Sequence, residues 1–70
     1  MPNINIQKAT KNKNFIQNAT FYIASLFEQD LILHDEKEQL LQTLLLLSTI
    51  DERQEKIILN NVLEDNNYEN

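Results

Sequence analysis

The sequence predicts a small all-α protein, and three observations lead to this class. The 70 residues contain no glycine, and their single proline is Pro2. A β-rich chain of this size needs tight turns, which favour glycine at positive φ. Apolar residues also recur at helical spacing in three successive stretches, the densest of which has six leucines in eight positions between Leu40 and Leu47. We therefore expect a three-helix unit whose central helix is rich in leucine.

The first helix is expected from about Phe15 to Gln29, with Asn14 as its N-cap, because an asparagine side chain can accept from a free backbone N–H. Its apolar residues share one face of the helix: Phe15, Ile16, Ala19, Tyr22, Ile23, Leu26 and Phe27. Phe21 projects away from this face. Residues 1–13 are rich in asparagine and lysine without sustained periodicity, and they predict a flexible basic arm.

A turn is expected over residues 30–34, where three consecutive apolar residues fit neither helix face. Asp35, with Glu38 three residues later, resembles a capping box that would begin the second helix. The alternative is one continuous helix from Phe15 to Thr49, since no glycine or proline forces a break.

The second helix is expected from about Glu36 to Ser48. Its leucines cover a broad face, which is typical of a helix packed between two others: Leu40, Leu41, Leu44, Leu45 and Leu47. Leu44 lies in the middle of this face and should be the most buried leucine, whereas Leu46 lies on the opposite side. A coiled-coil zipper needs regular a and d positions over three or more heptads, and the leucine run is too short for that. We therefore favour a core helix over a zipper.

Thr49 and Glu52 form the pattern of a second capping box, which predicts a third helix reaching about Glu64. Its apolar face contains Ile58, Leu59, Val62 and Leu63, while Ile57 points away from it. The helical domain would then span residues 14–65, followed by a flexible tail over residues 66–70.

The charge distribution argues against nucleic acid as a direct ligand. The net charge is −5. Residues 1–14 carry three lysines and no acid, whereas residues 15–70 carry three bases against eleven acids, a net −8. An acidic surface repels phosphate.

No apolar run approaches the ~18–20 residues of a membrane-spanning helix, and the absence of cysteine fits a reducing compartment. We expect a cytoplasmic protein without membrane association.

No group of residues carries a pattern for chemistry. His34, the single histidine, precedes Asp35 and Glu36, but metal sites usually need three or four convergent ligands. Adjacent helix positions point about 100° apart, so neighbouring acids do not face one another. We therefore expect no catalytic residue, no cofactor and no metal, and we do not expect an enzyme.

Two short stretches resemble known helical modules. Leu31 to Leu41 is similar to the turn of short helical-hairpin oligomerisation modules, and Ser48 to Glu55 looks like the segment after the DNA-binding unit of bacterial helix-turn-helix repressors. Each covers under a third of the chain and consists mostly of capping pattern. No functional residue is carried over from either.

Function is therefore expected from surfaces rather than from a catalytic centre. Each predicted helix leaves one large apolar residue off its main face, and these are Phe21, Leu46 and Ile57. We expect them at an interface with a partner or within a dimer, with a homodimer favoured. The predicted function is a small protein–protein interaction module, a regulator that binds a transcription factor or enzyme in a bacterium or phage. The alternatives are an acidic mimic of nucleic acid that inhibits a nucleic-acid-binding protein, and a self-associating structural protein.

Overall fold

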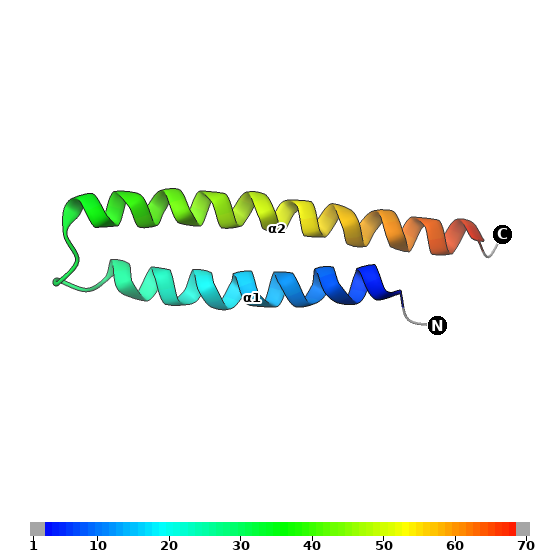
Figure 1. The fold of residues 1–70 in the computed structure, drawn as a ribbon, viewed down its shortest axis with the longest axis horizontal. Coiled ribbons are helices and arrows are strands. Elements are labelled where there is room, and N and C mark those ends of the chain that lie inside the picture. The colour runs from blue at the N-terminus through cyan, green and yellow to red at the C-terminus, as the bar shows by residue number, and fades with distance from the viewer. Residues whose placement is uncertain (1–2, 69–70) are drawn as a thin grey trace.

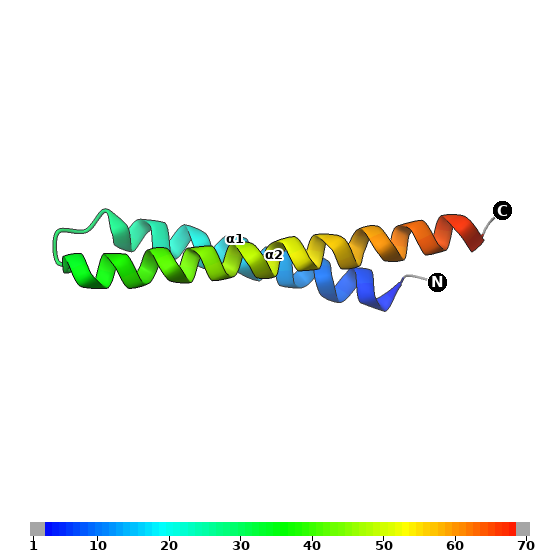
Figure 2. The ribbon, with the colours of Figure 1, turned by 90° about the horizontal axis from the view of Figure 1, so that it is seen from above.

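The chain forms an antiparallel hairpin of two α-helices in the computed structural model, which describes residues 3–68 (Figure 1). Helix α1 spans Ile4–Phe27 and helix α2 spans His34–Tyr68. Within residues 3–68 there is no strand, so the all-α class is confirmed. The hairpin measures 56 × 16 × 12 Å. Figures 1 and 2 show the two helices side by side, with the C-terminal end of α2 extending beyond α1.

The predicted third helix is wrong, because the second and third predicted helices are one continuous helix, α2. Thr49 does not cap a helix. Its Oγ1 donates to the carbonyl oxygen of Leu45 at 3.1 Å, a bond that threonines make in the interior of helices. Since neither glycine nor proline interrupts this stretch, the capping pattern alone was not enough to end the helix.

Helix α1 begins much earlier than predicted. Asn3, rather than Asn14, is its N-cap: the Asn3 backbone is extended, and its side chain accepts from the backbone N–H groups of Asn5 at 2.9 Å and Ile6 at 3.2 Å. Residues 4–13, where we expected a flexible arm, are therefore helical. Of the tail expected over residues 66–70, residues 66–68 belong to α2, while residues 69–70 lie outside the described part of the chain, as do residues 1–2.

The connection between the helices occupies residues 28–33, which confirms the predicted turn and excludes a continuous helix from Phe15 to Thr49. The predicted capping box is displaced by two residues. The backbone N–H of Leu33 donates to Glu36 Oε1 at 2.9 Å, and the backbone N–H of Lys37 donates to the Leu33 carbonyl at 2.9 Å. Glu36 thus reaches back to the residue before α2 in the way predicted for Glu38.

The surface of α2 that faces α1 follows a heptad pattern. Its less exposed residues include a series at alternating intervals of three and four: Lys37, Leu40, Leu44, Leu47, Asp51, Gln54, Ile58 and Asn61. These are the a and d positions of a coiled coil. We call these residues, together with the residues of α1 that face them, the seam. The sequence interpretation considered only the leucine run, which is too short for a zipper by itself. The repeat continues beyond this run, with polar side chains at half of its positions.

The facing side of α1 is also only partly apolar. Its less exposed positions are Ile6, Ala9, Lys13, Ile16, Ala19, Ile23 and Phe27. Among the residues that the structure describes, Ala9 at 2% exposure and Gln54 at 6% are the only buried ones. Leu44 is half-buried, as are Leu40 and Leu47, so no leucine forms a closed core. The hairpin encloses little apolar volume.

Candidate protein-interaction surfaces

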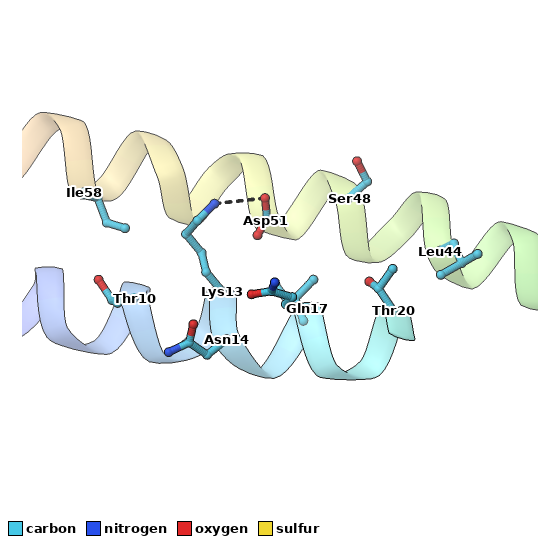
Figure 3. A pocket seen from close by; sticks show the side chains of 10 residues that line it. Thr10, Lys13, Asn14, Gln17, Thr20, Leu44, Ser48, Asp51 and Ile58 are labelled. Carbon is cyan, nitrogen blue, oxygen red and sulfur yellow. Dashed lines mark hydrogen bonds and ion pairs between the residues drawn. The ribbon is translucent and has the colours of Figure 1, made fainter. Parts of the chain in front are cut away.

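One side of the hairpin is hollowed into a groove of about 630 Å³. Figure 3 shows Thr10, Lys13 and Thr20 on α1 along one side of this groove and Leu44 and Ile58 on α2 along the other. The complete lining is Thr10, Lys13, Asn14, Ile16, Gln17, Thr20, Leu44, Ser48, Asp51 and Ile58. Small hydroxylic residues on both helices leave room between the helices, and Ile16, Leu44 and Ile58 supply an apolar lining.

Lys13 forms the only ion pairs between the helices within residues 3–64. Its Nζ lies 2.9 Å from Glu55 Oε2 and 3.0 Å from Asp51 Oδ2 (Figure 3 draws the contact with Asp51). The hydrogen bonds that Lys13 donates to Glu55 and then to Asp51 raise its pKa above the ordinary value of 10.5. Because both acids lie one helical turn apart, a single lysine binds both. This arrangement fixes the register of the hairpin.

Two amide contacts continue this register toward the open end of the hairpin. Asn12 Nδ2 donates to Gln54 Oε1 at 3.0 Å, and Asn3 Nδ2 donates to Asn61 Oδ1 at 3.1 Å. The open end is thus held by hydrogen bonds and ion pairs, whereas the end near the connection contains the leucines. Lys13, Asp51, Gln54 and Asn61 thus join the two segments of the chain across the hairpin.

The groove is bordered by exposed apolar residues, and together they form what we call the groove face: the groove with Phe21, Leu41, Leu45 and Leu59. Leu41 lies seven residues before the groove-lining Ser48, and Phe21 lies seven residues after Asn14, so each shares a side of its helix with a groove residue. The exposed fractions of these side chains are 69% for Phe21, 63% for Leu45, and 52% for Leu41 and for Leu59.

The opposite side carries a second apolar surface. We call it the back face: Ile4, Phe15, Tyr22 and Leu26 on α1, and Leu46, Ile50 and Ile57 on α2. Phe15 lies two residues before Gln17, and Leu46 lies two residues before Ser48. Two residues correspond to about 200° around a helix, so these side chains point away from the groove. Phe15 is 61% exposed and Tyr22 68%. The Tyr22 ring packs edge-on against the ring of Phe21, with centroids 5.9 Å apart, so the two faces meet along the outer side of α1.

The three residues predicted at an interface do not lie on one surface. Phe21 belongs to the groove face, whereas Leu46 and Ile57, which are eleven residues or about three turns apart, share the back face. Leu46 is 59% exposed and Ile57 is half-buried. Their role at an interface stays a prediction. Sequence reasoning missed the exposure of Tyr22, Leu41 and Leu45 because it assigned them to core faces. The heptad spacing on α2 is the signal that separates Leu41 and Leu45 from the residues that face α1.

No metal-binding arrangement occurs in the part of the chain that the structure describes, where no three His, Asp or Glu side chains converge. His34 Nε2 lies 3.3 Å from Glu38 Oε1, and both side chains are exposed to solvent. Within the same residues, neither helix contains a stretch long and apolar enough to cross a membrane.

The fold and its surfaces define a class, a two-helix hairpin with an apolar surface on each side. Comparisons of the chain with protein-family models, curated proteins and solved structures return no match.

Proposed function

We propose that the chain is a non-enzymatic interaction module that binds a larger protein through its groove face. The concrete version is a regulator of a transcription factor or an enzyme in a bacterium or phage. The observation that supports this proposal is the groove of about 630 Å³ bordered by exposed leucines and Phe21. Concave apolar surfaces with a polar margin are typical of sites that receive a side of another protein.

An amphipathic helix is the partner that this groove fits. The lining residues of α1 run from Thr10 to Thr20, which corresponds to roughly 15 Å or three helical turns. A partner helix of that length presents two or three apolar side chains at spacings of three and four residues. Helix α2 carries three bases against eight acids, a net −5, and Glu38 and Glu52 lie seven residues before and after Leu45, on the same side of α2. Basic residues beside the apolar side of the partner helix would complement these charges.

Leu45 and Leu63 provide matched variants for testing this proposal. Both are leucines of α2 with similar exposure, at 63% and 57%, but only Leu45 lies on the groove face, and Leu63 belongs to neither face. We would compare wild type, Leu45→Glu and Leu63→Glu as baits in pulldowns from the native cell with mass spectrometry. The captured protein would then be purified and its affinity for each variant measured.

The expected result is a protein that wild type and Leu63→Glu retain and that Leu45→Glu binds at least tenfold more weakly. Binding through an apolar groove should also persist as salt is raised, since screening acts mainly on charged contacts. Equal binding of that protein by all three baits would contradict the proposal. A steep loss of binding with salt would instead support the nucleic-acid mimic.

A further inference from the structure

We propose that a second copy of the chain covers the back face, so that two hairpins form a four-helix bundle. This inference does not depend on the proposed function, because it concerns the opposite side of the hairpin. Surface area provides its first argument. The chain exposes 5993 Å², whereas a compact monomer of 8.3 kDa would expose about 4,600 Å². The radius of gyration is 16.5 Å, compared with about 11 Å for a compact domain of this length.

The excess surface is large enough for a stable interface. It amounts to roughly 1,400 Å², and a standard interface buries about 800 Å² on each partner. Two aromatic rings on the back face supply a substantial part of this area, since each buries about 150–250 Å² when fully covered. Phe15 and Tyr22 are both more than half exposed, and Ile4 and Leu46 add exposed fractions of 61% and 59%.

The back face suits a bundle core better than the groove face does. Its centre is apolar on both helices, with Phe15 and Tyr22 on α1 and Leu46 and Ile50 on α2. Lys8 and Arg53, seven residues before Phe15 and seven after Leu46, lie on the same side nearer the open end. On the groove face, the α1 half is made largely of threonine, asparagine and glutamine side chains. Interfaces between copies of one chain have an apolar centre enriched in aromatic residues.

A second copy of the chain is favoured over a different protein as the occupant of the back face, because the hairpin needs stabilisation whenever the chain is made. Only Ala9 and Gln54 are buried among the described residues, so the hairpin core is far smaller than that of ordinary domains. A second copy is always present with the chain, and its binding stabilises the folded state by mass action.

The charges of the helices select one symmetry for this dimer. Helix α1 carries three lysines and no acid, a net +3, whereas α2 carries a net −5. A two-fold axis parallel to the helices places each α1 against α2 of the other copy, with both connections at the same end. A perpendicular axis would stack α1 on α1 and α2 on α2, which brings like charges together.

The cross-helix contacts give the register of this interface. The bond between Lys13 and Asp51 places Phe15 level with Ile50 and Tyr22 within about one turn of Leu46. A two-fold axis parallel to the helices leaves the position of each residue along the helix direction unchanged. Phe15 of one copy would therefore pack near Ile50 of the other, and Tyr22 near Leu46.

Sedimentation equilibrium of two matched pairs of variants tests the interface. Phe15→Glu and Leu46→Glu change the back face. Leu41→Glu and Leu45→Glu are their counterparts on the groove face, with exposures of 52% and 63% against 61% and 59%. We expect wild type and both groove-face variants to sediment at twice the 8.3 kDa chain mass. The back-face variants should dissociate, with a dimer Kd raised at least tenfold. A monomeric wild type, or dissociation of the groove-face variants instead, would overturn the proposal.

A spin label tests the symmetry without disturbing either face. The chain contains no cysteine, so Gln29→Cys in the connection between the helices provides a single labelling site. Pulsed electron paramagnetic resonance should give a label-to-label distance below half of the 56 Å length of the hairpin if both connections share one end. A distance near that full length, or the absence of any dipolar coupling, would refute the arrangement.

Discussion

Replacing Gln54 by leucine should stabilise the hairpin, although Gln54 is hydrogen-bonded in the structure. Gln54 is 6% exposed and accepts from Asn12 Nδ2 at 3.0 Å. Losing this bond costs about 0.5–1.5 kcal/mol, and because Asn12 is exposed, its amide group can be hydrated instead. Burying a leucine side chain contributes about 1.5–3 kcal/mol. We therefore expect the free energy of unfolding to rise by about 1 kcal/mol.

Urea unfolding monitored by far-ultraviolet circular dichroism, at one fixed protein concentration, measures this difference. Gln54→Ala is the matched control, since it removes the same bond without adding apolar volume, and it should lower the free energy of unfolding by about 1–3 kcal/mol. A loss of stability in Gln54→Leu comparable to that in Gln54→Ala would show that the amide contact outweighs apolar burial, and the reasoning would be wrong.

Three further predictions concern the N-cap of α1, the continuity of α2 and the ion pairs of Lys13. Thr49→Ala should change the free energy of unfolding by less than about 0.5 kcal/mol in urea titrations, because Thr49 lies inside α2 and caps no helix. A loss near 1 kcal/mol would indicate a helix cap at Thr49. Asn3→Ala should lower the free energy of unfolding by about 1–2 kcal/mol because it removes the N-cap, whereas Asn5→Ala in the exposed first turn should lower it by under about 0.5 kcal/mol. Thermal melts of the two variants would show equal losses if Asn3 were not the cap. Lys13→Met should be less stable than wild type below pH 10.5. Folding raises the pKa of Lys13, so this advantage of wild type is lost as the pH rises through the pKa of the folded state. Urea titrations across that pH range measure the loss. A stability difference that does not change with pH would contradict the prediction.

Much of the local structure could be predicted from the sequence, but the number of helices could not. Composition indicated an all-α chain, and the apolar spacing from Ile16 to Phe27 marked a helix that the structure confirms. At Thr49 the local pattern of a cap competed with the hydrogen-bond ladder of a continuous helix. The ladder persisted because no residue nearby breaks it and because α1 extends far enough to pack beside the C-terminal half of α2.

The seam and the surfaces were harder to find because polar residues occupy seam positions. Lys37, Asp51, Gln54 and Asn61 follow the same heptad as the leucines, yet each has a type normally assigned to the surface. Their role emerges only once α1 supplies partners such as Lys13. The apolar residues beside this seam consequently seemed to belong to a core, and the structure places them on two faces instead.

The uneven distribution of contacts along the hairpin has a consequence for the order of folding. The leucine-rich end lies beside the six-residue connection, so its contacts close a short loop, whereas the bond between Asn3 and Asn61 joins residues 58 positions apart. Closing a short loop costs less chain entropy than closing a long one. We expect the helices to associate first near the connection and then to pair progressively toward the termini, in the manner of other chains dominated by local contacts. Substitutions in the polar contacts of the open end should accordingly accelerate unfolding while leaving the folding rate nearly unchanged.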